Sequence, residues 1–282
     1  MINVIIPVHN RLKLTIKCIN SLKEQYNFSN LKIIVVDDAS TDNTFQYLKE
    51  NFKNITILKG SGSLFWGGAV NYGIEYVLKN SETNDWILLV NNDVELSVDT
   101  IKKLIEVSES KNRKAIVGAL TVSSTDKQTI IKSGTIVKSW FLNITKHIFK
   151  DKKIMNLTLK NYEKVDLLTG RCLLHPIEIF KRVGNYDSKR FIHYGADDEF
   201  SMRIKKYGYS SLLCTSTIVF LEPNFEKKKI TFFENFFGIR SSSNIINKFK
   251  FTLEVVPIYA KLSFFLISII KSLFIYLKKN MI

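Results

Sequence analysis

Short apolar runs alternate with segments of helical periodicity through residues 1–120. The runs are rich in Val, Ile and Leu and carry almost no charge, which is typical of strands buried on both faces of a sheet. The segment 11–25 differs, because Leu14, Cys18 and Leu22 fall on one side of a helix. We predict strands at 3–7, 32–37, 55–59, 86–90 and 115–120, and helices at 11–25, 42–52, 69–79 and 98–109.

This alternation predicts an α/β fold, Rossmann-like, with a mostly parallel central sheet and helices on both faces. In such sheets a ligand binds beyond the carboxyl ends of the strands. The strands here end in polar segments at 7–10 (PVHN), 37–40 (DDAS), 59–63 (KGSGS) and 91–93 (NND). We therefore expect a ligand site at that edge of the sheet.

Beyond Ile131 the alternation weakens, although extended and helical segments can still be assigned. Pro176 is predicted to open a helix that ends at Gly184, because proline suits a first helical position and glycine a C-terminal cap. Strands are expected at 133–141, 165–168, 172–174 and 211–221, and a helix is expected at 197–207.

The last segment, 257–279, is long and apolar but is interrupted by Lys261 and Lys271. At about 100° per residue, one sector of roughly 120° holds Lys261, Ser268, Lys271, Ser272, Lys278 and Lys279, with Lys250 belonging to it loosely. The opposite side consists of Leu, Ile, Phe, Val and Tyr apart from one serine. That layout is typical of a helix lying in a membrane interface. A helix packed on the domain or on a partner subunit, as in a homodimer, is the alternative.

The formal net charge of +15 makes nucleic acid, anionic lipid and phosphate-bearing substrates candidate partners. No helix-turn-helix, zinc-finger or RNA-binding signature is present, so nucleic acid is not expected. Cys18, Cys172 and Cys214 form no motif and suit a reducing compartment. Asn3 and Pro7 interrupt the first apolar run, so no signal peptide is expected.

Acidic residues follow two of the buried strands. Asp37 and Asp38 are adjacent and therefore point in opposite directions, so one can face a ligand while the other caps the turn. A turn and helix cap alone would also explain this pair. Asp93 follows Asn91 and Asn92, and one carboxylate can hold a hard divalent cation when a diphosphate supplies further oxygens. A turn aspartate is the alternative there.

A third acidic cluster, in 193–209 (HYGADDEFSMRIKKYGY), opens a predicted helix. A helix N-terminus favours ionised carboxylates, whereas neighbouring like charges raise their pKa. An ionised, ligand-facing Asp197 suits a general base. Acids that merely complement the helix dipole are the alternative, and this fits Asp198 and Glu199 better than Asp197.

Taken in order, VIIPVHNR, IIVVDDASTDNT, LLVNNDVEL and YGADDEFSMRIKKYGY resemble segments of the family 2 inverting glycosyltransferases, which have the GT-A fold. GSLFWGGAVNYG (62–73) and LLTGRCLLHPIEIFKRVGNYD (167–187) resemble the bacterial branch that builds surface polysaccharides such as O-antigen and capsule. That branch has rhamnosyl-, glucosyl- and galactosyltransferase-like members. The resemblance implies a glycosyltransferase domain at 1–225, with donor binding in 1–120 and acceptor binding and catalysis in 121–225, followed by a helical extension at 226–282.

The resemblance also implies a nucleotide-diphospho-sugar donor, UDP- or dTDP-linked, with Mn²⁺ or Mg²⁺ as cofactor. Asp93 matches the acid that holds the metal, and Asp197 matches the catalytic base. The donor nucleotide is expected at Pro7, Val8, His9, Arg11, Asp37, Asp38 and Asn92. The donor sugar is expected at Trp66, Gly67, Gly68 and Asn71, and the acceptor or a phosphate at Arg171, His193 and Asp198.

Two positions depart from the family pattern. Asn91 stands where the metal motif usually has its first acid, which predicts weak metal binding until a donor diphosphate arrives. Ala196 replaces the usual Glu before the base, and Asp198 or Glu199 is the candidate substitute.

The resemblance thus implies a transferase that builds glycan on an undecaprenyl-diphosphate carrier, in the cytoplasm or at the cytoplasmic face of the bacterial inner membrane. A sugar-1-phosphate nucleotidyltransferase would need a glycine-rich loop after the first strand, which PVHNRLK lacks. A degenerate sugar-nucleotide-binding subunit is suggested by Asn91 and Ala196 but opposed by Asp93 and Asp197.

Overall fold

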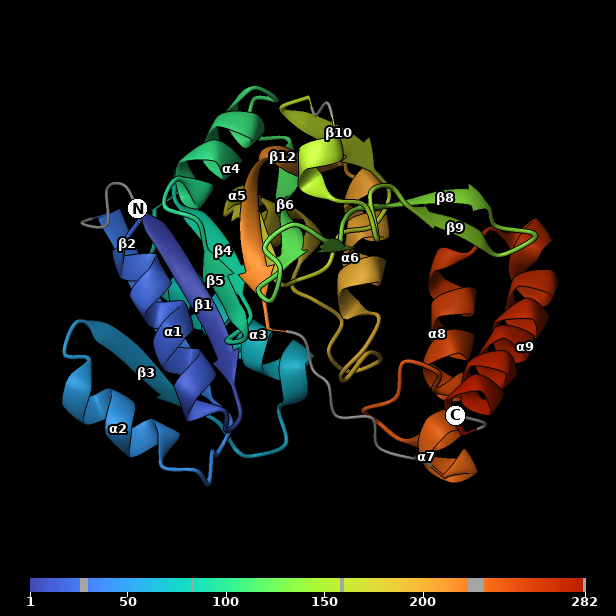
Figure 1. Ribbon diagram of the computed structural model, residues 1–282, viewed down its shortest axis with the longest axis horizontal. Helices are drawn as coiled ribbons and strands as arrows, with labels where there is room; N and C mark the ends of the chain where they lie inside the picture. The colour runs from blue at the N-terminus through green and yellow to red at the C-terminus, as the bar shows by residue number, and fades with distance from the viewer. Residues whose placement is uncertain (26–29, 83, 158–159, 223–230, 281–282) are drawn as a thin grey trace.

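A mixed β-sheet forms the centre of the protein, with helices on both faces and a helical extension at one side (Figure 1). The computed structural model describes residues 1–25, 30–82, 84–157, 160–222 and 231–280. The strands of this sheet are β1 (Ile2–Val8), β2 (Leu31–Asp37), β3 (Ile55–Lys59), β4 (Trp86–Val90), β5 (Val94–Leu96), β6 (Ala115–Ser123), β7 (Ile130–Lys132), β10 (Tyr162–Val165), β11 (Cys172–Pro176) and β12 (Ser210–Leu221).

The strand order is β10-β12-β6-β11-β4-β1-β2-β3, with β5 paired to β12 and β7 to β6. The half formed by β4, β1, β2 and β3 is parallel, and its register aligns Val8 with Asp37 and Asp37 with Lys59. The polar segments after these strands therefore meet at one edge, as the sequence predicts. β11 lies antiparallel between β4 and β6 and brings the segment before it to the same edge.

Helices cover both faces because each of them buries one apolar side. On one face α1 (Leu12–Lys23), α2 (Thr44–Asn51) and α4 (Thr100–Glu109) contribute to one cluster of buried side chains. On the other face α3 (Phe65–Lys79), α5 (Glu178–Val183) and α6 (Ala196–Lys205) contribute to a second cluster. The mostly parallel sheet and its two helical layers confirm the α/β prediction.

Three local predictions are wrong. Pro176 ends β11 rather than opening a helix, because it pairs with Trp86 at a strand end, where a missing N–H is tolerated. The strand expected at 165–168 lies earlier, as β10, and pairs with β12. Helix α3 begins at Phe65 rather than at Ala69, so Gly67 and Gly68 belong to its first turn.

Outside the sheet and its two helical layers, the described chain forms a two-stranded hairpin, three α-helices and two short 3-10 helices at Ile154–Asn156 and Ile258–Ala260. The hairpin pairs β8 (Thr135–Ser139) with β9 (Ile144–His147). The extension contains α7 (Phe232–Phe237), α8 (Ile245–Val255) and α9 (Lys261–Asn280). Helix α8 packs on α6, and α9 packs on α8 (Figure 1). The boundary predicted after residue 225 lies outside the described residues.

Candidate active site at the carboxyl ends of the strands

The ends of β1 and β2 are joined by hydrogen bonds. Asp38 N donates to Val8 O at 2.8 Å, and His9 Nδ1 lies 2.7 Å from Asp38 O. Pro7 is opposite Val36 in the β1–β2 register. The residues predicted to contact a nucleotide therefore form one connected strand end, while the contact itself stays a prediction.

The two adjacent acids have different neighbours. Asp37 Oδ1 accepts a hydrogen bond from Ser40 N at 3.1 Å and another from the Ser40 hydroxyl, so Asp37 caps the turn. Asp38 accepts from Gly62 N at 2.6 Å and from Phe65 N at 3.1 Å. Asp38 is 4% exposed and holds the glycine-rich loop that leads into α3. Its predicted contact with a nucleobase remains untested by these bonds.

The side chains of Asn91 and Asn92 are both held by hydrogen bonds to other residues of the protein. Asn91 Oδ1 accepts a hydrogen bond from Trp66 Nε1 at 2.9 Å. Asn92 is buried and donates to Thr15 Oγ1 of α1 at 3.0 Å. Asn91 therefore supports the indole of Trp66, and Asn92 fastens the strand end to α1. The contact predicted between Asn92 and the donor nucleotide stays a prediction.

Asp93 lies between two arginines. Arg11 Nη1 is 3.4 Å from Asp93 Oδ2, and Arg171 Nη1 is 3.8 Å from Asp93 Oδ1. The second distance is an ion pair but too long for a hydrogen bond. Asp93 Oδ1 is buried and accepts no hydrogen bond from any residue of the described chain. Such an oxygen is free to bind a cation or a donor group.

The turn before β11 connects Asp93 to the acidic helix. Asn91 N donates to Arg171 O at 2.8 Å, and Gly170 N donates to Asp197 Oδ2 at 3.2 Å. The indole of Trp66 covers this turn so closely that a Cβ at Gly170 would lie 2.2 Å from its ring. Glycine is therefore required at position 170 by packing.

Asp197 lies in the first turn of α6, and opposing effects act on the pKa of its carboxyl. Burial raises the pKa of the Asp197 carboxyl above its ordinary value. The backbone N–H groups of Gly170 and Asp198 and the guanidinium of Arg171 act in the opposite direction. These donors stabilise the ionised form, and burial makes that form a stronger base.

Asp198 is a second acid at this helix start. Burial, and then the charge of Asp197, raise its pKa well above the ordinary value, while Lys132 lowers it. Burial, and then the charges of Arg171 and Lys150, lower the pKa of Lys132 on β7, while Asp197 and Asp198 act in the opposite direction. No sequence motif marks Lys132, because β7 is joined to the sheet by its pairing with β6 and not by a pattern near the site residues.

Glu199 cannot replace the acid missing at position 196. Its carboxylate binds Arg203 at 2.7 and 3.0 Å, and Arg203 also donates to Val183 O and Asn185 O. Glu199 is buried in this structural ion pair. Of the two substitutes that the sequence suggested, Asp198 alone stays available.

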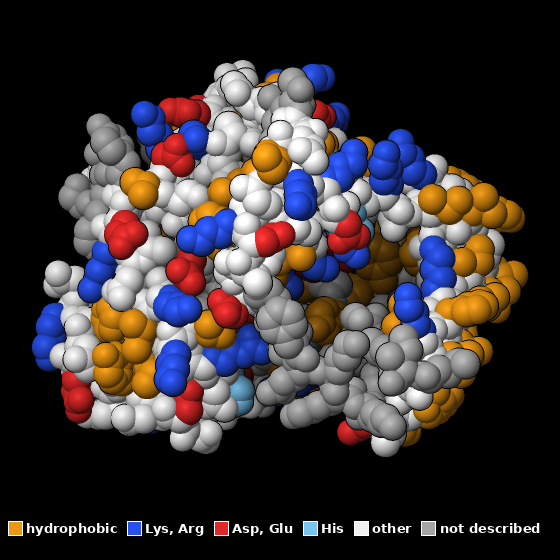
Figure 2. Space-filling model, viewed as in Figure 1, with side chains coloured by type: hydrophobic (Ala, Val, Ile, Leu, Met, Phe, Trp, Pro, Cys, Tyr) orange, Lys and Arg blue, Asp and Glu red, His pale blue; other side chains and the backbone are white. Residues whose placement is uncertain are grey.

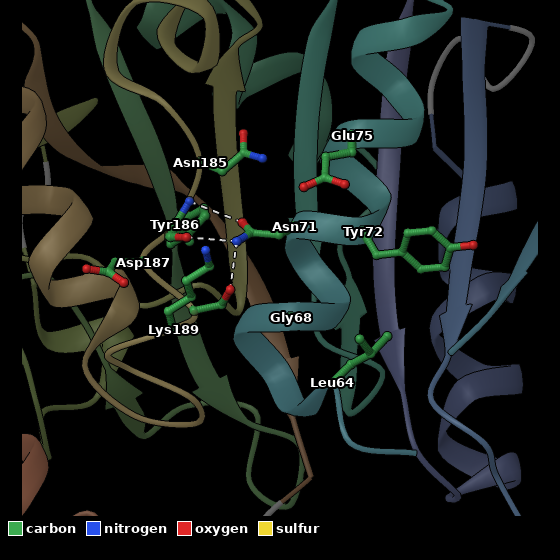
Figure 3. Close-up of a pocket in the computed structure, with 10 residues that line it drawn as sticks. Leu64, Gly68, Asn71, Tyr72, Glu75, Asn185, Tyr186, Asp187 and Lys189 are labelled. Carbon is green, nitrogen blue, oxygen red and sulfur yellow. Dashed lines mark hydrogen bonds between the residues drawn. The ribbon is translucent and has the colours of Figure 1, made fainter. Parts of the chain in front are cut away.

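The residues predicted to contact the donor sugar lie along α3. Asn71 joins α3 to the segment after α5, because its amide donates to Tyr186 O at 2.7 Å and to Ser188 Oγ at 3.0 Å (Figure 3). Gly68 and Asn71 line a pocket of about 440 Å³ beside this junction. At Gly67 a Cβ would lie 3.1 Å from Ser188 Cβ, so glycine allows this close approach. The sugar contacts remain predictions.

His193 lies near the start of α3. Its ring meets the Phe65 ring edge-on at 6.2 Å, and its Nδ1 is buried without a hydrogen bond from the described residues. Burial and the charge of Arg240 lower the pKa of His193, which keeps the imidazole neutral near pH 7. A neutral ring with a free nitrogen can bind a hydroxyl, in agreement with its expected acceptor role.

The structure thus assembles two connected groups of predicted residues. One is the strand end that contains Pro7, His9 and Asp38, and the other is a row of charged side chains. Arg11, Asp93, Arg171 and Asp197 form a charged row, and Trp66 joins it through Asn91. Among the residues that the structure describes, no group of three His, Cys, Asp or Glu side chains could hold a metal. A cation here would need ligands from a substrate.

The chain is similar to known proteins in sequence and in fold. A family model described as Glycosyl transferase family 2 matches residues 3–166. An uncharacterized glycosyltransferase of Mycoplasma pneumoniae, the MG060 homolog, is 27% identical over 77% of this chain and 77% of its own length. The N-acetylglucosaminyl-diphospho-decaprenol L-rhamnosyltransferase of Mycobacterium tuberculosis is 23% identical over 67% of this chain and 66% of its own length.

Two solved structures share the fold. GalNAc-T7 with UDP, GalNAc and Mn²⁺ superimposes with a TM-score of 0.63 at 16% identity and covers 80% of this chain. This chain spans 44% of that protein. Staphylococcus aureus TarS 1-349 covers 99% of this chain and 73% of its own, with a TM-score of 0.57 at 16% identity. At identities this low, the two superpositions show a shared GT-A-like architecture.

Proposed function

The chain belongs to glycosyl transferase family 2, and on this premise we propose that it transfers a sugar, with inversion, from a UDP- or dTDP-linked donor to a glycan hydroxyl. The supporting observation is the partly buried carboxylate of Asp197, which lies beside Arg171 and at the same sheet edge as Asp93. The fold and the family make the protein a transferase.

Asp197 acts as the general base in this proposal. It removes the proton from the acceptor hydroxyl, whose oxygen forms a bond to the anomeric carbon. The bond between that carbon and the nucleoside diphosphate breaks on the opposite side, which inverts the configuration. The N–H groups of Gly170 and Asp198 orient the carboxylate for this transfer.

Arg11 and Arg171 are placed to bind the donor diphosphate. Both guanidiniums reach Asp93, and the Arg11 side chain is 50% exposed. An entering diphosphate can replace the long contacts to Asp93 with shorter charge-assisted hydrogen bonds. The arginines then neutralise the negative charge that develops as the diphosphate leaves.

The residues present fit a divalent cation, Mn²⁺ or Mg²⁺, provided that the donor supplies most of its ligands. Asp93 would hold the cation, because Oδ1 is buried and accepts no hydrogen bond from the described residues. Asn91 adds nothing, since its side-chain oxygen accepts from Trp66. Such a cation, when bound, supplies positive charge beside the diphosphate.

We further propose that the acceptor is carried on undecaprenyl diphosphate and is used at the cytoplasmic face of the bacterial inner membrane. The M. tuberculosis relative is named for a diphospho-decaprenol substrate, which supports an acceptor of this class. The donor sugar and the linkage are defined by the assay below.

Asp197→Asn tests the proposed base. Transfer from UDP- and dTDP-sugars, measured with Mn²⁺ or Mg²⁺, should fall by about 10²- to 10⁴-fold, because proton transfer is lost. Donor binding, measured by calorimetry, should persist. Asp151→Asn is the control, since that side chain is 75% exposed and far from this cluster in sequence. Normal turnover in Asp197→Asn would show that another group is the base.

A further inference from the structure

Helix α9 carries its apolar side outward. At about 100° per residue, its outward sector of roughly 120° contains six large apolar side chains, with Ser263 among them and Asn280 at the edge. The exposed fractions include 75% for Leu262 and 70% for Phe274. The six side chains are Leu262, Leu266, Ile270, Leu273, Phe274 and Leu277. An exposed continuous apolar face of this kind marks an interaction site.

The polar side of the same helix faces the protein. Ser268 and Ser272 are 2% and 1% exposed. Asn143, in the hairpin loop, donates to Ser268 Oγ at 2.8 Å and accepts a hydrogen bond from Lys271 through its carbonyl. The chain itself therefore satisfies the polar side, and this arrangement is the reverse of a surface helix in water.

Two neighbouring segments extend the exposed apolar surface. At the hairpin tip, Phe141 and Leu142 are 54% and 51% exposed, next to the Asn143 that binds α9. At the other end of α9, Tyr276 meets the ring of Phe232 in α7, and Phe233 is 70% exposed. We call the α9 outward sector, the hairpin tip and these α7 rings the apolar shelf. Apolar side chains gather along this edge of the molecule in Figure 2.

Lysines border the apolar shelf. Lys271 and Lys278 are exposed on α9 at one margin of the outward sector, and Lys138 and Lys146 are exposed on the hairpin. Long lysine side chains can keep the ammonium at a charged boundary while their methylenes lie on apolar surface. The chain as a whole carries +15. This pattern complements a surface with an apolar interior and a negatively charged outer layer.

We propose that the apolar shelf docks onto an anionic lipid bilayer, with α9 lying along the membrane surface and the hairpin tip inserting beside it. This proposal rests on the proposed function, in which the acceptor is lipid-linked. It adds the hairpin and α7 to the membrane contact, so that three segments distant in sequence dock together.

One helical stretch of the described residues, Ile258–Lys278, is long and apolar enough to cross a membrane, with a mean hydropathy of 1.8. It contains most of α9. Its packing favours the surface position instead. Spanning would break the hydrogen bonds that join Asn143 of the hairpin to Ser268 and Lys271. It would also place the Lys271 ammonium in hydrocarbon, where an unpaired charge is costly.

Vesicle co-sedimentation tests the docking. The full chain should bind vesicles of phosphatidylglycerol and phosphatidylethanolamine, bind less at high salt, and bind weakly to phosphatidylcholine. Leu266→Glu/Phe274→Glu should abolish binding. Phe141→Ser/Leu142→Ser should lower the partition about tenfold or more, because two inserted side chains lose their transfer energy. Val98→Glu is the control, at a position that is 59% exposed on the sheet domain.

Each result that contradicts these expectations overturns a stated part of the docking proposal. No sedimentation of the wild-type chain overturns the docking, and wild-type binding by the hairpin variant overturns the composite surface. Resistance to alkaline carbonate extraction would show a spanning helix. A dimer that forms without lipid and is lost in the α9 variant would make the shelf a contact between copies. Circular dichroism and binding of the donor nucleotide, UDP or dTDP, check the folding of each variant.

The lipid assay contains no sugar donor, so its result is separate from that of the transfer reaction. A chain that binds vesicles but transfers no sugar would contradict the proposed function alone. A chain that transfers sugar to a soluble acceptor but ignores vesicles would contradict the docking alone.

Discussion

At the scale of single residues, Arg171 connects the parts of the site. Its carbonyl accepts from Asn91, its guanidinium faces Asp93, and its charge acts on Asp197. The sequence identified Arg171 as a candidate for acceptor or phosphate contact, but it could not show that the two acids lie on either side of it. Lys132 was missed altogether, since nothing near it in the sequence marks a site.

Arg171→Gln should change both donor binding and pH dependence. The guanidinium lowers the pKa of Asp197, so its loss raises that pKa further. The base is then ionised only at higher pH, and the acid limb of kcat/KM should move upward. The donor KM should rise because the diphosphate site loses one of its two guanidinium groups.

The full pH–rate profile of Arg171→Gln measures both effects. Arg182→Gln, on the exposed side of α5, is a suitable control with the same loss of charge. A raised KM with an unmoved acid limb would mean that Arg171 binds the donor without tuning Asp197.

At the scale of elements, local patterns predicted the strands well and their connections poorly. The runs at 55–59 and 86–90 became β3 and β4 with the expected bounds. In β4 all five residues are buried, as an uninterrupted apolar run requires, whereas β3 is a half-buried edge strand. The antiparallel insertion of β11 between β4 and β6 has no local signature. It nevertheless delivers the turn 169–171 to the site.

Gly170→Ala should damage this turn through Trp66. The new Cβ would lie 2.2 Å from the indole, so either the turn or the ring must move. We expect a loss of about 1–3 kcal/mol in the free energy of unfolding, as for overpacking elsewhere. Denaturant unfolding measures it, and donor binding should weaken as the Trp66–Asn91 hydrogen bond is disturbed.

The double variant Gly170→Ala/Trp66→Leu gives the matched comparison. Removing the indole frees the space that the methyl group needs, so the two changes should be less than additive. Strict additivity would show that the close approach between Gly170 and Trp66 does not limit this turn.

At the scale of the whole molecule, the sheet domain and the α9 region have separate cores. Two clusters cover the faces of the sheet, while Val256, Ala260 and Phe264 form a small third cluster with Trp140 and Phe251. The extension therefore contacts the domain mainly through α8 on α6 and through the hairpin.

Removal of residues 257–282 should leave the sheet domain folded. Neither sheet cluster contains a residue of α9, so we expect Tm to change by no more than about 4 °C. Donor binding should be retained, while vesicle binding should be lost. A truncated chain that keeps its circular dichroism but loses the donor binding of the full chain would place the extension within the donor site.

The sequence by itself determined the α/β class, the polar edge of the sheet and the family resemblance, because apolar periodicity and short motifs are local properties of the chain. It also marked Asp93 and Asp197. Only the tertiary structure showed that Arg11 and Arg171 bracket Asp93, that Glu199 is committed to Arg203, and that α9 turns its apolar side outward. Those features depend on strand order and packing between distant segments, and local patterns do not encode these contacts.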